Sequence, residues 1–235
     1  MILLLSGWGQ KFDSLKAIFK DPTFDPIFLE KNQITHLDYS KFSSVEDLFS
    51  SIKDQRINPK AIIGWSLGGQ IAIRLIERKI LAPKKLFLIA PPFQMVKDDK
   101  ISAAMSQKTY QEFYTNFTNS PSKTLKQFSI LTSMNDKNSR EIVKSLDIND
   151  SNSDNLKFWL EELKRFSCFD ITFSNFPKTI FIQGKGDMIV HPNQAKYFQN
   201  LITEFTLETF ANCGHAPHLN DTKRVAKLIL DNIDS

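Results

Sequence analysis

The sequence predicts an α/β fold with about six parallel strands in one sheet, helices on both faces and a helical insertion. Short apolar runs that end at glycine or proline alternate with segments whose apolar residues recur at helical spacing. The stretch from about 93 to 173 breaks this rhythm, because it has helical patterns but no glycine and no strand pattern. A length of 235 residues fits one domain that carries such an insertion.

The expected strands are continuous apolar runs, which is typical of strands buried on both faces of a parallel sheet. The four clearest runs are residues 2–5, 60–63, 85–90 and 179–182, and two weaker ones are 34–37 and 205–210. Helical spacing marks the segments 44–52, 70–78, 193–201 and 222–233.

We expect residues 1–92 and 174–235 to form the core of the fold and residues 93–173 to form a lid of about four helices. Apolar and aromatic residues recur at helical spacing in 110–117, 125–131, 142–146 and 156–163. The polar, acidic stretch 145–155 is expected to be a loop between two of these helices.

The composition excludes several classes of protein. The net charge of +4, from 30 Lys and Arg against 26 Asp and Glu, is too small to imply a nucleic-acid partner. No apolar run approaches the roughly 20 residues of a membrane span, and no secretory signal pattern is present. Two cysteines without metal-ligand spacing, Cys168 and Cys213, indicate a reducing compartment. We therefore expect a cytoplasmic monomer without a metal or organic cofactor.

All eight glycines fall in four short windows, near residues 7, 66, 185 and 214. Glycine is required where the backbone takes a positive φ or approaches another group closely. Four such windows in a chain otherwise free of glycine predict four functional loops.

The window Gly64-Trp-Ser-Leu-Gly-Gly69 lies between an expected strand and an expected helix. This is the context of the G-x-S-x-G nucleophile elbow, in which small residues flank a serine on a strained turn. Ser66 is therefore the candidate nucleophile. The amide of Leu67, at the start of the helix, is a candidate donor to an oxyanion.

A serine hydroxyl needs an adjacent base. His215 is the candidate, because it follows the last expected strand and precedes the last helix. His218 lies three residues further on and is a competing candidate. His36 and His191 are interpreted as structural.

The acid is expected after the strand that precedes the last helix–strand unit. Asp187 has that position, and it would orient His215 and stabilise its imidazolium form. Asp170 is the alternative, but it precedes the strand. The remaining window, Ser6-Gly-Trp-Gly9, follows the first strand, so the Trp8 amide is the second candidate oxyanion donor.

With these four windows the chain resembles the α/β-hydrolase superfamily. More narrowly, it is similar to the pimeloyl-[acyl-carrier protein] methyl ester esterases of biotin synthesis. The similarity rests on Gly7-Trp-Gly9, on the elbow, on the lid stretch 123–134 and on Gly214-His-Ala-Pro217. It implies a Ser66, Asp187 and His215 triad, with oxyanion amides from Trp8 and Leu67.

The resemblance also implies a substrate-binding site and a partner. Trp8, Trp65 and Phe128 match residues that line the acyl channel. Lys123, Arg140 and Lys144 match basic lid positions that bind the carrier protein, and Lys126 stands beside another such position, which is Gln127 here.

The chain departs from the family pattern at three points. Ser6 replaces a histidine before the oxyanion loop, which puts the rigidity of that loop in question. His218 stands where the family tends to have an aromatic residue. The family has two short strands before the first parallel strand, and we expect them to be missing here.

The lid also has a charge pattern of its own. Between residues 120 and 145 lie five basic and two acidic residues, and Lys137, Arg140 and Lys144 share one helix face at i, i+3 and i+7. Such a stripe suits an acidic carrier protein, although a solvated helix face is its commoner meaning.

The triad residues predict a serine esterase, and the resemblance implies that it is a carboxylesterase that hydrolyses the methyl ester of pimeloyl-[acyl-carrier protein]. One alternative is a hydrolase of small free esters or thioesters. A second is a non-catalytic protein of this fold that binds a carrier or another partner, although three matching triad residues argue against it.

Overall fold

The computed structural model describes residues 1–234 and contains one six-stranded parallel sheet. The strands lie in the order β2-β1-β3-β4-β5-β6. Their bounds are β1 Ile2–Leu5, β2 Ile34–His36, β3 Ala61–Trp65, β4 Lys85–Ile89, β5 Lys178–Gly184 and β6 Phe205–Phe210. All six strands that the sequence predicts are present, and every neighbouring pair is parallel.

Alternate strand residues face opposite sides of the sheet, and both sides are buried. Leu3, Ile62 and Leu86 belong to one apolar core, whereas Ile2, Ala61 and Phe87 belong to the other. This double burial is the physical reason for the continuous apolar runs, because an alternating pattern would place polar side chains against helices on one face.

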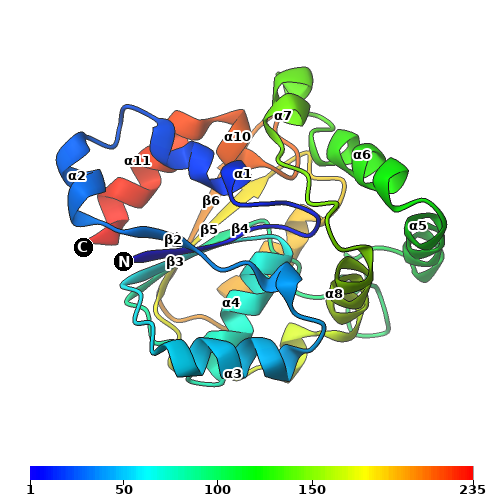
Figure 1. The fold of residues 1–235 in the computed structure, drawn as a ribbon, viewed down its shortest axis with the longest axis horizontal. Coiled ribbons are helices and arrows are strands. Elements are labelled where there is room, and N and C mark those ends of the chain that lie inside the picture. The colour runs from blue at the N-terminus through cyan, green and yellow to red at the C-terminus, as the bar shows by residue number, and fades with distance from the viewer. Residues whose placement is uncertain (235) are drawn as a thin grey trace.

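Helices cover both faces of the sheet (Figure 1). The first core packs against α3 (Val45–Gln55), α4 (Leu67–Glu77) and α9 (Ala195–Gln199). The second packs against α1 (Asp13–Lys16), the 3-10 helix η1 (Ala17–Lys20) and α11 (Thr222–Ile233), as Val225 and Ile229 illustrate. The expected helix 193–201 is shorter in the structure, since a 3-10 turn η4 (Pro192–Gln194) precedes α9.

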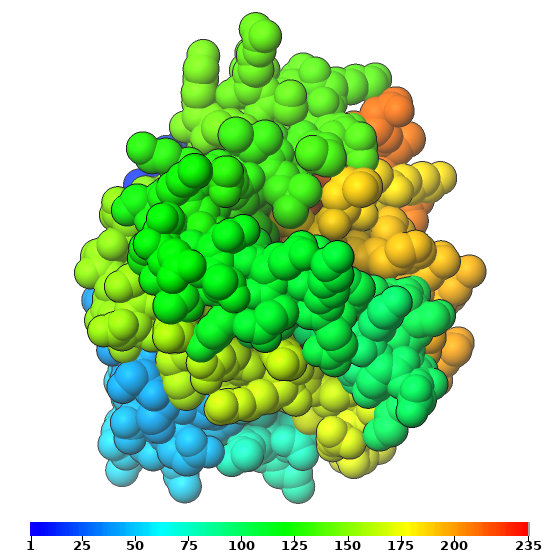
Figure 2. All heavy atoms as spheres, turned by 90° about the vertical axis from the view of Figure 1, so that its right-hand side faces the viewer, coloured from blue at the N-terminus to red at the C-terminus, as the bar shows by residue number. Residues whose placement is uncertain are grey.

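Four helices are inserted between β4 and β5, as the periodicity predicts. They are α5 (Gln107–Asn119), α6 (Pro121–Thr132), α7 (Ser139–Ser145) and α8 (Ser153–Arg165). They lie beyond the carboxyl ends of the strands (Figure 1), and they cover much of the face of the molecule seen in Figure 2. The division into a core and a separate lid at residues 93 and 173 stays a prediction.

The remaining elements are short and complete the connections. They are α2 (Pro26–Lys31), η2 (Tyr39–Lys41), η3 (Cys168–Asp170) and α10 (Pro217–Asn220). Within residues 1–234, no helix is both long enough and apolar enough to cross a membrane.

The insertion is tied to the loop that follows β1. The amide of Lys11 donates to the oxygen of Asp147 at 2.7 Å, and the amide of Asn149 donates to the oxygen of Gly9 at 2.9 Å. Gln10 and Ile148 form an antiparallel bridge between these bonds. A loop of the insertion therefore pairs with the loop that carries Trp8.

Candidate active site

Ser66 lies on a strained turn between β3 and α4. Its φ of 53° and ψ of −121° place it in a backbone region that non-glycine residues rarely adopt. A hydrogen bond of 2.8 Å from the Ser66 amide to the oxygen of Ile89 anchors the turn to β4. A Cβ at Gly68 would lie 2.1 Å from the oxygen of Leu5, so only glycine fits there. These are the features of a nucleophile elbow.

Asp187 and His215 form a buried hydrogen-bonded pair. Nδ1 of His215 lies 2.7 Å from Oδ2 of Asp187, and the side chains are 1% and 0% exposed. Oδ1 of Asp187 accepts the amides of Ile189 and Val190 at 2.8 and 2.9 Å, and Gln183 donates to Oδ2 at 3.0 Å. Four donors therefore fix the orientation of this carboxylate.

The pairing with Asp187 leaves the other ring nitrogen of His215 available. In a neutral imidazole, an Nδ1–H group that donates a hydrogen bond to this carboxylate leaves a lone pair on Nε2. Within the described residues, Nε2 is buried and has no hydrogen-bond partner. Ser66, Asp187 and His215 follow β3, β5 and β6, so all three stand at the carboxyl edge of the sheet. This is where open α/β sheets bind ligands.

The competing histidine lies in a different environment. His218, on α10, is fully buried, and its ring packs edge-on against Trp65 at 4.6 Å. Burial, with a contribution from nearby His215, lowers the pKa of His218 to about 3. In the described part of the chain, neither ring nitrogen of His218 has a hydrogen-bond partner of ordinary geometry. It is paired with no carboxylate, so it lacks the orienting partner that His215 has.

The other three candidates from the sequence lie outside this pair. His36 is on β2, where its Nε2 lies 3.3 Å from Oγ of Ser6 and its ring stacks on Phe12. His191 is exposed and accepts the amide of Asn193 at 3.2 Å. Asp170 is exposed at the end of η3. Of the two candidate acids, the structure pairs Asp187, and not Asp170, with His215.

One candidate oxyanion amide lies at the start of a helix, and the other lies in a loop that hydrogen bonds hold in place. Leu67 is the first residue of α4, and the first amides of a helix have no partner inside it. The loop of Trp8 is fixed by a bond of 2.9 Å from the Ser6 hydroxyl to the oxygen of Lys11. Ser6, which stands where the family has a histidine, thus forms a hydrogen bond within this loop. No sequence pattern indicates this bond or the pairing with residues 147 and 149.

A small apolar cavity adjoins Ser66. Its volume is about 30 Å³, room for about one water molecule. An acyl chain can enter only if lining side chains move. The lining residues are Trp8, Ser66, Met95, Met105, Tyr110, Phe113, Phe128, Leu131, Leu160, Leu163 and Ile189.

The cavity includes two of the three residues that the resemblance assigns to substrate binding. Trp8 packs edge-on against Phe113 and Phe128, with ring centroids 5.5 and 5.4 Å apart. Trp65 is not among the residues that line this cavity, and its assignment to the acyl channel stays a prediction. Its indole donates to the oxygen of His215 at 2.9 Å and packs on His218, because the side chain of the residue before Ser66 points to the opposite face of the sheet.

Sequence reasoning missed most of the cavity wall. Tyr110, Leu160 and Leu163 come from α5 and α8, and their helical spacing was the only signal that they face inward. That spacing shows that a helix face is buried, but it does not show what the face covers.

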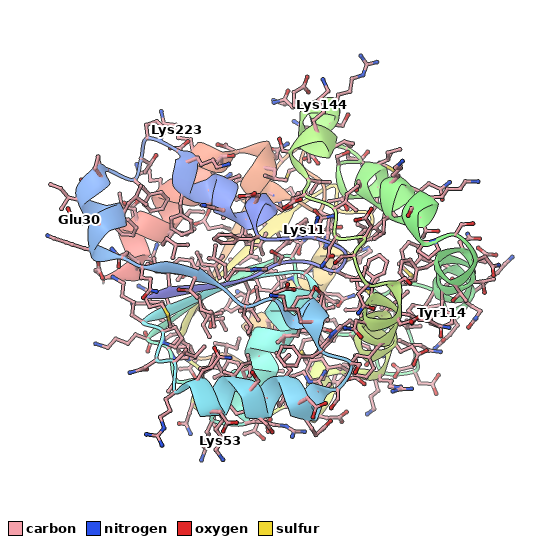
Figure 3. The ribbon with its side chains drawn as sticks, in the orientation of Figure 1. Lys11, Glu30, Lys53, Tyr114, Lys144 and Lys223 are labelled. Atoms are coloured by element: carbon pink, nitrogen blue, oxygen red, sulfur yellow. The ribbon has the colours of Figure 1, made fainter. Side chains whose placement is uncertain are left out.

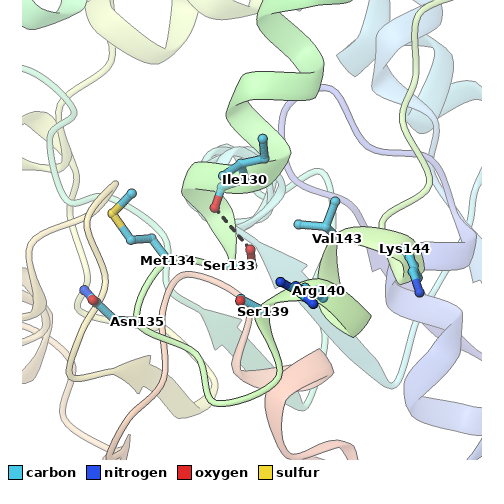
Figure 4. A pocket seen from close by; sticks show the side chains of 8 residues that line it. All are labelled: Ile130, Ser133, Met134, Asn135, Ser139, Arg140, Val143 and Lys144. Carbon is cyan, nitrogen blue, oxygen red and sulfur yellow. Dashed lines mark hydrogen bonds between the residues drawn. The ribbon is translucent and has the colours of Figure 1, made fainter.

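The basic residues of the insertion lie on its outer surface. Arg140 and Lys144 line an open pocket of about 520 Å³ together with the apolar side chains of Ile130, Met134 and Val143 (Figure 4). Figure 3 shows Lys144 on α7 at the periphery of the molecule. Lys123 and Lys126 are exposed on α6 and do not line this pocket.

Curated relatives match this chain at modest identity. The chain is 28% identical over 250 residues to the biotin biosynthesis bifunctional protein BioHC of Teredinibacter turnerae, covering 97% of this chain and 44% of that protein. It is 27% identical over 184 residues to the pimeloyl-[acyl-carrier protein] methyl ester esterase of Aromatoleum aromaticum, covering 72% of each. The chain therefore spans less than half of the bifunctional relative.

Solved structures share the fold at low identity. An esterase from Exiguobacterium antarcticum matches with a TM-score of 0.82 and 16% identity, over 100% of this chain and 91% of that one. A bromoperoxidase from Bacillus anthracis matches with a TM-score of 0.80 and 12% identity, over the same shares. The family model described as alpha/beta hydrolase fold matches residues 31–222, which is most of the chain. The protein therefore belongs to the alpha/beta hydrolase fold family.

Proposed function

We propose that the protein is a serine carboxylesterase that hydrolyses the methyl ester of pimeloyl-[acyl-carrier protein]. The observation that carries the proposal is the buried pair of His215 and Asp187, 2.7 Å apart, at the same sheet edge as Ser66 on its strained turn. An exposed histidine–carboxylate pair is common, but a fully buried one beside a nucleophile elbow is the arrangement that serine hydrolases require.

In this mechanism Nε2 of His215 takes the proton of the Ser66 hydroxyl as the oxygen attacks the ester carbonyl. The amides of Trp8 and Leu67 stabilise the oxyanion that forms on the carbonyl oxygen. The protonated His215 then gives its proton to the departing methoxide, and methanol leaves. Water, deprotonated by the same nitrogen, attacks the acyl-enzyme and releases the free acid. Asp187 keeps His215 in the required tautomer throughout.

The apolar cavity and the named relatives support the choice of substrate. The cavity beside Ser66 is walled by apolar and aromatic side chains, which suits the methylene chain of a pimeloyl group. One of the named relatives is a biotin biosynthesis protein by its printed name, and the other is named as an esterase of the pimeloyl-[acyl-carrier protein] methyl ester. No step of the mechanism uses a metal or organic cofactor.

We also propose that the insertion acts as a lid and that its outer face binds the carrier protein. Arg140 and Lys144 flank a pocket that also exposes Ile130 (57% exposed) and Met134 (42% exposed). Lys123 and Lys126 extend the positive charge along α6. Apolar contacts within a basic rim suit an acidic helical partner by steering and by burial. We place the reaction in the cytoplasm and expect the enzyme to act as a monomer.

The test is hydrolysis of methyl-pimeloyl carrier protein, followed as release of the free acid. Ser66→Ala should fold normally and lose most of its turnover, with a residual rate on the order of 10³-fold over water. A fluorophosphonate probe should label the wild type and not this variant. Turnover of small esters but not of the carrier substrate would favour the small-ester hydrolase. No labelling and no turnover in the wild type would favour a non-catalytic binding protein.

A further inference from the structure

Residues 132–136, which start at the end of α6, contact the two loops that carry His215 and Asp187. We call them the bridging segment. The oxygen of Thr132 accepts the amide of His215 at 3.0 Å. The Asn135 side chain donates to the oxygen of Gly186, the residue before Asp187, at 2.9 Å. The insertion therefore holds the base and the acid loops from one side.

Asp136 makes the most extensive contacts of this segment. Its Oδ1 accepts the amide of Gly214 at 2.9 Å and the side-chain amide of Asn220 at 2.7 Å. Gly214 directly precedes His215, and Asn220 ends α10, which follows it. One carboxylate oxygen thus joins the chain on both sides of the candidate base.

The contact at Gly214 is too close for any side chain. A Cβ there would lie 2.4 Å from the oxygen of Met134 and 2.9 Å from Oδ2 of Asp136. Glycine is required by this approach, and it is also the residue whose backbone is freest when nothing holds it. Asp136 is half-buried, and burial raises the pKa of its carboxyl group while the bonds to Gly214 and Asn220 oppose that shift.

We propose that Asp136 is a positioning residue, which holds the Gly214–His215 peptide so that the imidazole meets Asp187 and presents Nε2 toward Ser66. The inference rests on the proposed function for its effect on turnover. Asp136 does not line the cavity beside Ser66. Its side chain accepts hydrogen bonds from Gly214 and Asn220, not from Ser66 or Asp187. Asp136 therefore acts on His215 through the main-chain amide of Gly214.

Within the described residues, hydrogen bonds to Thr132, Trp65 and Asp136 hold the main chain of Gly214 and His215, and the bond to Asp136 can be deleted without changing the cavity or the triad. The amide of His215 bonds the main chain of Thr132, and its oxygen accepts the indole of Trp65. The first bond joins two main chains, so no side-chain substitution deletes it. The second comes from Trp65, which adjoins Ser66, so its deletion would disturb the triad. The bond from Gly214 ends on the Asp136 side chain. A misplacement of about 1 Å at a catalytic group can cost 10²-fold in rate.

The test compares three variants on a small ester such as p-nitrophenyl butyrate, so that carrier binding plays no part. Asp136→Ala should lower kcat by about 10- to 100-fold with KM within about twofold, because the ground-state cavity is intact. Asp136→Asn keeps an Oδ1 acceptor and should restore kcat to within a few-fold of the wild type. Asn220→Ala, which deletes one donor and leaves the carboxylate, is the milder variant and should lower kcat several-fold.

The matched control is Asp221→Ala. Asp221 caps α11 by accepting the amide of Arg224 at 3.0 Å, so the variant loses a comparable carboxylate–amide bond close to the same loop. The melting temperature of Asp221→Ala should fall by about as much as that of Asp136→Ala. The kcat of Asp221→Ala should stay at the wild-type value. If Asp221→Ala and Asp136→Ala lose kcat equally, the effect is general destabilisation and the proposal is overturned.

A spectroscopic readout separates this inference from the proposed function. The Nδ1 proton that His215 shares with Asp187 should give a low-field proton resonance, assigned by its loss in His215→Gln. Asp136→Ala should shift or broaden it, whereas Asp136→Asn and Asp221→Ala should leave it in place. If the wild type hydrolyses no ester but the resonance still responds to Asp136→Ala, the proposed function fails and the positioning role stands. A resonance that Asp136→Ala leaves unchanged overturns the positioning role.

Discussion

The indole nitrogen of Trp8 donates a hydrogen bond of 2.8 Å to the main-chain oxygen of Leu156. The two residues are 148 positions apart, one in the loop after β1 and the other in α8. The side chain of a candidate oxyanion residue is thus anchored to the insertion, and the pairing of Lys11 with Asp147 reinforces the anchor.

Trp8→Phe should test this anchor, because it keeps an aromatic ring and deletes the donor. We expect kcat on a small ester to fall several-fold as the oxyanion loop loosens. The free energy of unfolding should fall by about 1 kcal/mol for the lost hydrogen bond. Trp159→Phe is the control, since it deletes a similar bond of 2.9 Å to the oxygen of Phe42 away from the cavity. It should cost similar stability and leave kcat unchanged; a matching loss of kcat would refute the anchor.

Asp187→Asn should lower kcat by about 10⁴-fold while the fold is retained, because an amide can orient His215 in the wrong tautomer. The measurement is ester hydrolysis together with a thermal melt. Asp170→Asn, at the exposed alternative, should hydrolyse the ester at close to the wild-type rate. The reverse ranking of the two variants would transfer the role of the acid to Asp170.

His218→Phe should change how stability depends on pH. Burial depresses the pKa of His218 in the folded state to about 3, from the ordinary histidine value of about 6.5 that applies in the unfolded chain. Above pH 6.5 neither state binds the proton, so the residue makes no contribution there. As the pH falls from 6.5 toward 3, only the unfolded state takes up the proton, and folding stability is lost at about 1.4 kcal/mol per pH unit.

The phenylalanine variant lacks this proton uptake. Urea unfolding at pH 7 and pH 5 should therefore show that the wild type loses about 2 kcal/mol more than the variant between these values. Comparing the two proteins at both pH values cancels the other titrating groups. Equal losses in both proteins would show that His218 is not a buried neutral histidine.

Replacing together four exposed basic residues of the insertion should harm only carrier-bound substrate. Exposed ion pairs contribute about 0–1 kcal/mol each, so single changes can be silent and the combined variant is needed. The set is Lys123, Lys126, Arg140 and Lys144. KM for methyl-pimeloyl carrier protein should rise, mainly through slower association. Activity on a small free ester should persist.

Two comparisons sharpen this experiment. Added salt should raise KM of the wild type toward that of the variant, because exposed charges are screened beyond about 8–10 Å. The pair Arg140 and Lys144, which lines the pocket of Figure 4, should matter more than the pair Lys123 and Lys126. Equal losses on both substrates would mean that the changes disturb packing of the insertion, and no loss on either would mean that this face is merely solvated.

The sequence by itself determined the sheet and the local geometry around Ser66. Strands buried on both faces are apolar along nearly their whole length, so Ile2–Leu5 and residues 86–89 could be recognised without any knowledge of their neighbours. The elbow is equally local, because Gly64 and Gly68 flank the serine within one turn of chain. The position of His215 after the last strand followed from chain order alone.

The tertiary structure decided what lies behind and around these groups. Trp65 stands beside Ser66 in the sequence, but successive residues of a strand point to opposite faces, and its indole supports His215 instead of lining the cavity. Asp136 counted only as one of two acids in a basic stretch, yet it bonds Gly214, 78 residues away. Such contacts depend on how separate helices are oriented on the sheet, and orientation is set by packing between distant segments, which no local pattern records.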